Sequence, residues 1–125
     1  MEFTPKRDIA KQFVNLVFEG AIEKAFANYT APEFIHHTVE CKKGKTALIA
    51  YLKECSLEKE KIKHQFLRLI EQNDLVMAHI RICNTVSKEE YVAVFIFRFK
   101  EHLINEYWEV KQNLPKTLLN EDGVF

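Results

Sequence analysis

The residues best suited to chemistry include a carboxyl group and a phenol that stand two positions apart near the end of the chain. Tyr107 and Glu109 belong to an extended run at residues 103–112, so their side chains share one face of a strand. Two histidines are further candidates: His79 lies midway along an earlier alternating run, and His37 follows two apolar residues. Carboxyl, imidazole and phenol groups can transfer protons or donate them in hydrogen bonds. Proton transfer is therefore the chemistry that these residue types suit, although strand parity alone leaves open whether Tyr107 and Glu109 face the interior or the solvent.

The second half of the chain alternates with the period of two that predicts β-strands. Both alternating sets of side chains are largely apolar, whereas a sheet with one face in water would have one polar set. Each face of the sheet therefore needs a cover. We expect the helices before residue 60 on one face and a second copy of the chain, in a homodimer, on the outer face. The strands are expected over these segments, with polar turns between them: 62–71, 75–82, 93–99 and 106–110.

The first half of the chain has helical periodicity. Thr4 and Pro5 predict a helix start, because a hydroxyl can cap the first turn and the missing N–H of proline costs nothing there. Gly20 predicts the end of this helix, since glycine suits a left-handed cap. A four-stranded antiparallel meander after the helices is an α+β arrangement. Between the first helix and the strands we expect a short second helix, an extended or single-turn segment at 33–37, a third helix from Gly44 to Cys55 and a solvated charged connector at 56–61.

Composition restricts the classes of function. The 125 residues predict one domain, 1–125, and 18 basic residues balance 18 acidic ones, which argues against a nucleic-acid binder. No apolar run approaches the roughly 20 residues of a membrane span, and the first residues lack the apolar core of a signal peptide. The three cysteines are widely spaced and fit neither a disulfide framework nor a zinc knuckle. We therefore expect a cytoplasmic protein with reduced thiols, no membrane contact, no metal and no cofactor.

Five local strings, in chain order, resemble the SnoaL-like branch of the NTF2-like superfamily, whose members are related to polyketide cyclases. The resemblance covers nearly the whole chain and is most specific in the last third, where even the ending Asn-Glu-Asp-Gly-Val-Phe is similar. It implies a cone-shaped α+β fold, with three N-terminal helices packed on a strongly curved antiparallel sheet. The five strings are Phe-Ile-His-His at 34–37, the glycine and helix at 44–54, the strand start at 71–82, Phe-Ile-Phe-Arg-Phe at 95–99 and Ile-Asn-Glu-Tyr-Trp-Glu-Val at 104–110.

The resemblance also implies a pocket and a kind of chemistry. Cyclases of this branch close rings without a cofactor, by aldol-type condensation, which requires a base and a donor for the developing enolate oxygen. Transferred to this chain, Glu109 is the base, and Tyr107, His79 and His37 are the residues that orient it or donate hydrogen bonds. The substrate would be a small apolar carbonyl compound. Its expected contacts are Phe13, Met77, Tyr91, Phe95 and Phe97.

Three departures from the pattern keep other functions open. Phe95 stands where the branch has an aspartate, Tyr107-Trp108-Glu109 stands for His-Trp-Asp, and Glu101-His102 replaces an Asn-Gly turn. A phenylalanine in place of a pocket acid makes the cavity smaller and more apolar. One alternative is therefore a non-catalytic module that binds a small hydrophobic ligand, and another is a purely dimeric interaction domain of the same fold.

Overall fold

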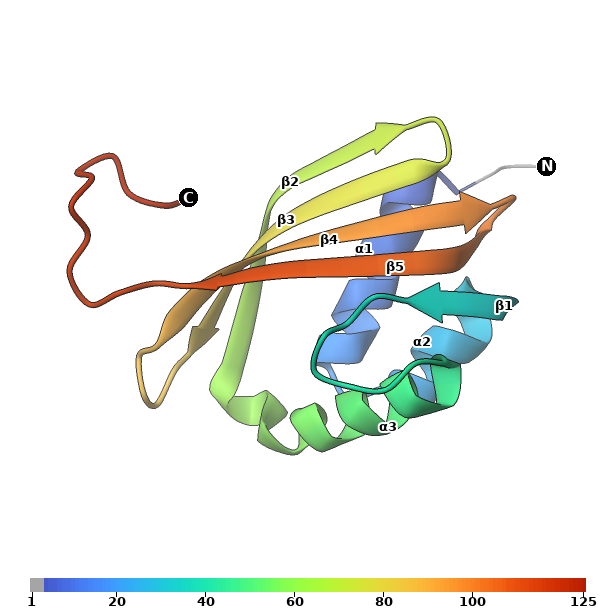
Figure 1. The fold of residues 1–125 in the computed structure, drawn as a ribbon, viewed down its shortest axis with the longest axis horizontal. Coiled ribbons are helices and arrows are strands. Elements are labelled where there is room, and N and C mark those ends of the chain that lie inside the picture. Colours follow the sequence, from blue (N-terminus) through green and yellow to red (C-terminus); the bar gives the residue numbers. More distant parts are fainter. Residues whose placement is uncertain (1–3) are drawn as a thin grey trace.

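One curved sheet organises the chain, and the helices lie against its inner face (Figure 1). The computed structural model describes residues 4–125, which contain three α-helices, one 3₁₀ helix and five strands. The expected α+β architecture is confirmed, and the sheet is open rather than closed into a barrel. The elements are α1 (Lys6–Phe18), α2 (Ile22–Tyr29), β1 (Thr30–His36), α3 (Lys45–Cys55), the 3₁₀ helix η1 (Ser56–Lys61), β2 (Ile62–Gln72), β3 (Leu75–Asn84), β4 (Glu90–Lys100) and β5 (Leu103–Asn113).

The strand order is β1-β5-β4-β3-β2, and the last four strands form the predicted antiparallel meander. The sheet has one strand more than the sequence predicts. β1 is the segment expected to be extended or a single turn, and it pairs in parallel with β5. Register shifts interrupt the β2–β3 ladder between Phe66 and Arg68 and the β4–β5 ladder between Arg98 and Phe99. Such irregularities increase the local twist and bend the strands around the helices.

The inner face of the sheet is apolar and buried over most of β3 and β4. Alternate residues of β3 and β4 point toward the helices, and Phe97 at the centre is 0% exposed. The ring of Phe13 from α1 meets Phe26 and Phe97 edge to face, with ring centroids 5.2 and 5.8 Å apart. Aromatic pairs in this geometry add about 0.5–1.5 kcal/mol beyond the area they bury. These contacts hold α1 across the sheet and leave space beside it, toward α3.

The helix ends agree with the sequence in part. Gly20 follows α1 with a φ of +87°, as its left-handed cap role requires. A Cβ at Gly20 would also lie 2.8 Å from Cδ of Lys59, so the end of α1 packs closely on η1. Thr4 does not cap α1: Pro5 occupies the N-cap position, and in the first turn the backbone N–H of Arg7 donates a hydrogen bond to Oε1 of Glu71 on β2. The charged connector forms the 3₁₀ helix η1, and it is solvated as expected, since none of its residues is buried.

The outer face of the sheet mixes apolar side chains with ion pairs. Val94, Ile96 and Trp108 are partly exposed there, and Ile70 and Val110 are 52% and 62% exposed. The charged pairs are Arg81 with Glu90 and Arg98 with Asp74 and Glu106, and the ring of Phe125 from the C-terminal segment lies over Arg81. Arg98 is thus a surface ion-pair residue on the face opposite Phe95, as its position in the strand predicts.

Candidate ligand cavity

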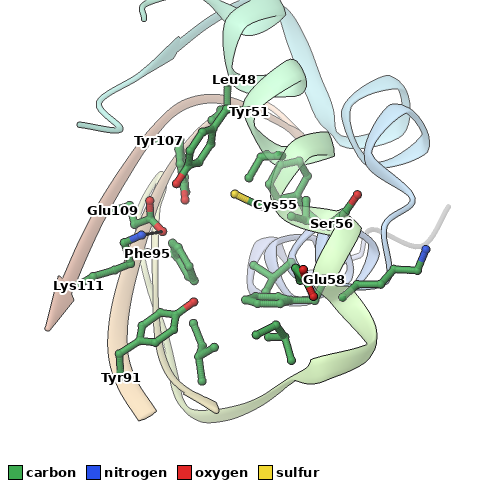
Figure 2. Close-up of a pocket in the computed structure, with 18 of the residues that line it drawn as sticks. Leu48, Tyr51, Cys55, Ser56, Glu58, Tyr91, Phe95, Tyr107, Glu109 and Lys111 are labelled. Carbon is green, nitrogen blue, oxygen red and sulfur yellow. Dashed lines mark ion pairs between the residues drawn. The ribbon is translucent and has the colours of Figure 1, made fainter. Parts of the chain in front are cut away.

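A cavity of about 290 Å³ lies between the inner face of the sheet, α1, α3 and η1 (Figure 2). Its walls are mainly apolar, and the polar groups gather mostly on β5, α3 and η1. The lining residues are Phe13, Val14, Val17, Phe18, Leu48, Tyr51, Leu52, Cys55, Ser56, Glu58, Lys59, Ile62, Ile82, Tyr91, Phe95, Phe97, Tyr107, Glu109 and Lys111.

The alternation of β5 places its polar side chains in the cavity. Tyr107, Glu109 and Lys111 line the cavity, whereas Trp108 and Val110 between them point to the outer face. The pairing of β5 with β4 then sets Phe95 directly opposite Glu109. Figure 2 shows Glu109 and Lys111 on the same wall, next to the Phe95 ring, with α3 across the cavity.

Glu109 is the most unusual charged group in the cavity. Its side chain is only 13% exposed, and the nearest cation is the ammonium of Lys111, whose Nζ lies 3.9 Å from Oε1. Burial raises the pKa of the Glu109 carboxyl; Lys111 lowers it in part, and the Glu40 carboxylate raises it further. A carboxyl whose pKa is raised toward neutral pH both takes up and returns protons more readily under cellular conditions.

Three tyrosines surround the carboxyl. Burial raises the pKa of the Tyr107, Tyr51 and Tyr91 hydroxyls, so all three remain protonated near neutral pH. Charge on Tyr51 influences Tyr107, and Glu109 influences all three, which places the group in one electrostatic neighbourhood. A protonated phenol in an apolar site is a strong hydrogen-bond donor to a developing negative oxygen.

The rest of the cavity is suited to a hydrophobic ligand. The Phe95 ring stacks on Tyr107 with ring centroids 5.8 Å apart, and Phe97 packs beside both rings. Leu48 and Leu52 of α3 and Val17 of α1 complete the apolar walls. Such walls exclude water, which strengthens hydrogen bonds and electrostatic interactions at the polar end.

Most of the site residues proposed from the sequence lie together in this cavity. Tyr107 and Glu109 line it, with Tyr91 on the same wall. Three aromatic residues expected to contact substrate also line it: Phe13, Phe95 and Phe97.

The structure does not bring His79, Met77 or His37 to the cavity, which corrects the expected convergence of the histidines on Glu109. Ala78 and Ile80 are fully buried on the inner face, so the intervening His79 and the adjacent Met77 must point outward. On the outer face, Arg68 donates a hydrogen bond to Nδ1 of His79 over 2.8 Å.

His37 lies on the outer face as well, because β1 turns its neighbour inward. The His37 ring stacks on Trp108, with centroids 5.1 Å apart, and its Nε2 lies 2.7 Å from Oε2 of Glu106. His36 points inward and is only 7% exposed. Its Nδ1 accepts a hydrogen bond from the backbone N–H of Thr38, so Nε2 carries the proton and donates it to the Lys42 carbonyl.

Three groups that shape the site were not identified as functional from the sequence. Tyr51 lies on α3, and its side chain lines the cavity from there. Lys111 has the same strand parity as Glu109, which is the signal that could have found it. Glu40 lies in the segment between β1 and α3, and the distance of 3.2 Å from its Oε1 to Nζ of Lys111 could not be read from any spacing.

Among the residues that the structure describes, no three histidine, cysteine, aspartate or glutamate side chains gather in a group that could hold a metal ion. None of the helices within residues 4–125 is long and apolar enough to cross a membrane.

Solved structures of other proteins share this fold. A candidate polyketide cyclase from Acidithiobacillus ferrooxidans matches 89% of this chain and 91% of its own, with a TM-score of 0.69 and 17% identity. A candidate ketosteroid isomerase from Kribbella flavida matches 96% of this chain and 87% of its own, with a TM-score of 0.70 and 13% identity. An NTF2-like protein of unknown function from Cytophaga hutchinsonii matches 90% and 95%, with a TM-score of 0.66 and 12% identity.

The chain therefore has the NTF2-like fold, as its resemblance to that superfamily implies. No family model matches the sequence, and neither does any curated protein. At identities of 17% or less, these similarities show the architecture, and the chemistry must be argued from the side chains in the cavity.

Proposed function

We propose that the cavity binds a small apolar carbonyl compound and that Glu109 removes a proton from the carbon next to the carbonyl group. The observation that carries this proposal is a nearly buried carboxyl group, with a raised pKa, on the β5 wall of a mainly apolar cavity. Desolvated carboxyl groups of this kind cluster at catalytic sites. The reaction requires a base and an oxyanion donor, and the chain supplies both without a cofactor.

The steps follow from the positions of these groups. The Glu109 carboxylate accepts the proton, and the electron pair of the C–H bond moves toward the carbonyl oxygen to give an enolate. A tyrosine hydroxyl, from Tyr107 or Tyr51, donates a hydrogen bond to that oxygen. If the enolate is conjugated with a double bond, return of the proton to a different carbon isomerises the substrate. Attack of the enolate carbon on a second carbonyl closes a ring instead, and the proton held by Glu109 passes to the alkoxide that forms.

The size and lining of the cavity support a compact, hydrophobic substrate. A volume of about 290 Å³ is at the lower end of the roughly 300–1,000 Å³ that is typical for small-molecule pockets. The candidate polyketide cyclase and the candidate ketosteroid isomerase among the structural neighbours are named for reactions of carbonyl compounds, which agrees with this class. His79 and His37 have no part in the proposed reaction, since both lie on the outer face.

A second function, binding of a hydrophobic ligand without turnover, is favoured by Phe95. This ring occupies the position opposite Glu109 on β4 and stacks on Tyr107. It therefore fills space beside the carboxyl where a second polar group would assist acid–base chemistry. The two functions differ in one measurable property, namely whether a bound ketone exchanges protons.

The test uses 2-tetralone, a compact fused-ring ketone with acidic C–H groups, and 2-naphthol, a phenol that mimics its enol form. We expect the protein to accelerate deuterium incorporation into 2-tetralone in heavy water, and 2-naphthol to bind and inhibit. Binding of 2-naphthol without accelerated exchange of 2-tetralone would favour the non-catalytic alternative. If neither compound binds, a cavity suited to apolar ring compounds is contradicted.

We also propose that the protein is a homodimer joined through the outer face of the sheet. This face carries exposed apolar side chains, Ile70 and Val110, next to the partly exposed Val94, Ile96 and Trp108. Sedimentation at micromolar concentration is expected to give about twice the chain mass of 14.8 kDa. Val110→Glu should shift the mass toward one chain, because it places a charge in the apolar contact. A wild-type monomer under these conditions would contradict the proposal.

A further inference from the structure

Lys111 lies between two carboxylates that come from different parts of the chain. Its Nζ is 3.2 Å from Oε1 of Glu40 and 3.9 Å from Oε1 of Glu109, and it lies 5.9 Å from the centre of the Tyr91 ring. Glu40 belongs to the segment between β1 and α3, whereas Lys111 and Glu109 belong to β5. A single ammonium group therefore lies between a surface carboxylate and a nearly buried one, and its one positive charge does not balance both.

Lys111 also stands at the boundary between two spaces. Together with Tyr91 it lines the apolar cavity, and the same two residues line an open polar hollow that is completed by Glu40 and Asn113. The ammonium can thus approach Glu109 on the cavity side or Glu40 on the hollow side by rotation about its flexible four-carbon chain. The two contacts compete for one cation, since the shorter one, to Glu40, draws the charge away from Glu109.

The other groups around Glu109 add no further cation close to it. The nearby titratable groups are phenols and thiols, together with one carboxylate and one ammonium on η1. By element they are Tyr107 on β5, Tyr91 on β4, Tyr51 and Cys55 on α3, Cys41 beside Glu40, and Glu58 and Lys59 on η1. Lys59 is not paired with Glu109 and lies against Gly20 instead.

We propose that Lys111 is a positioning residue that divides its charge between Glu109 and Glu40 and thereby sets the fraction of Glu109 that is ionised in the empty cavity. The inference rests on the proposed function for its significance, because a general base is active only as the carboxylate. In this arrangement Lys111 keeps the base ionised, and Glu40 opposes that effect by holding the ammonium on the other side. The direct influences on the pKa of Glu109 have the same signs: Lys111 lowers it and Glu40 raises it.

The test is a titration of the Glu109 carboxyl carbon by nuclear magnetic resonance, in protein with isotope-labelled glutamate. Glu109→Gln identifies the signal by its disappearance. Lys111→Met is expected to shift the titration midpoint of Glu109 to higher pH, and Glu40→Gln to lower pH. Lys111→Arg should restore a midpoint near that of the wild type, since it keeps the charge. Lys24→Met, an exposed position on α2 that lines neither space, serves as the matched control that leaves the midpoint unchanged.

Competition for the cation is tested by combining the two changes. If Glu40 acts by holding Lys111, then Glu40→Gln should shift the Glu109 midpoint less in the Lys111→Met background than in the wild type. Equal shifts in both backgrounds, or single shifts in the same direction, would overturn the proposal. Circular dichroism of each variant confirms that the fold is retained.

The titration requires no substrate, so it is separable from the test of the proposed function. Opposite midpoint shifts together with unaccelerated 2-tetralone exchange would leave the positioning role in place and remove the catalytic one. If 2-tetralone exchange is accelerated but the Glu109 midpoint does not move in the variants, the role of Glu109 as the base is retained and the role of Lys111 is overturned.

Discussion

Glu109→Gln is expected to reduce the deuterium exchange of 2-tetralone by roughly 10²–10⁴-fold, the range in which positioned acid–base groups contribute. The amide has almost the same shape as the carboxyl but cannot accept a proton at catalytic pH. The apolar walls and the tyrosine donors are left in place, so 2-naphthol should still bind. The measurement is exchange rate against 2-tetralone concentration, which separates turnover from affinity. Exchange within a factor of two or three of wild type would show that another group is the base.

Glu109→Gln should also change stability, and in the opposite direction: the variant loses activity but gains free energy of unfolding at high pH. Because burial raises the pKa of Glu109 above its ordinary value of 4.5, the folded state binds more protons than the unfolded state between these two pKa values. The contribution of Glu109 to the free energy of unfolding of the wild type is therefore present at low pH and is lost as the pH rises through the pKa of the folded state. Glutamine has no such loss, so Glu109→Gln should be the more stable protein at about pH 8, with the advantage disappearing below about pH 4. Thermal unfolding at several pH values measures the difference, and a variant that is less stable at all of them would contradict the desolvation of this carboxyl.

Phe97→Ala is expected to have the largest effect on stability, with a loss of about 3–5 kcal/mol in the free energy of unfolding. Phe97 is fully buried at the centre of β4, and its ring contacts those of Phe13, Phe95 and Tyr107. Removal of the ring takes away these contacts and enlarges a space that the surrounding strands cannot close. Chemical denaturation of the purified variant measures the loss.

Phe125→Ala provides a matched control with the same chemical change. Its ring is 37% exposed and lies over the Arg81 guanidinium, with a centroid distance of 4.6 Å. An exposed contact of this kind contributes about 0.5–1 kcal/mol, so the control should lose far less than Phe97→Ala. Similar losses in the two variants would mean that the core is not centred on Phe97.

Period-two alternation made the sheet predictable from the sequence. The strands from Ile62 onward and their turns follow directly from where apolar and polar residues alternate, and so does the inward set that ends in Tyr107 and Glu109. Parity defines two sets of residues but does not say which set faces the helices. For β5 the answer came from packing: Tyr107 stacks with Phe95 inside, whereas Trp108 stacks with His37 outside.

The wrong placement predicted for the histidines has the same cause, because parity does not say which face of the sheet points inward. His79 was assigned to the pocket through a resemblance of sequence strings, although its neighbours Ala78 and Ile80 are the small and branched residues that the interior of this sheet requires. The partnership of Lys111 with Glu40 could not be predicted for a different reason. It joins a strand to an irregular segment about seventy positions away, and side-chain periodicity carries no information on such a contact.

Only part of β5 is held on both sides, which follows from how far β1 extends along it. The paired positions run from Thr30 with Ile104 to His36 with Tyr107, and the N–H of His37 donates the final bond to the Tyr107 carbonyl. From Glu109 onward the strand is held by β4 alone. Tyr107 is thus held between two neighbouring strands, whereas Glu109 lies on a part of β5 that has one neighbouring strand and can bend more easily. The cavity could therefore admit a bulky ligand if this end of β5 bends outward, on the side where Glu40 contacts Lys111, while the aromatic rings of the core stay in place.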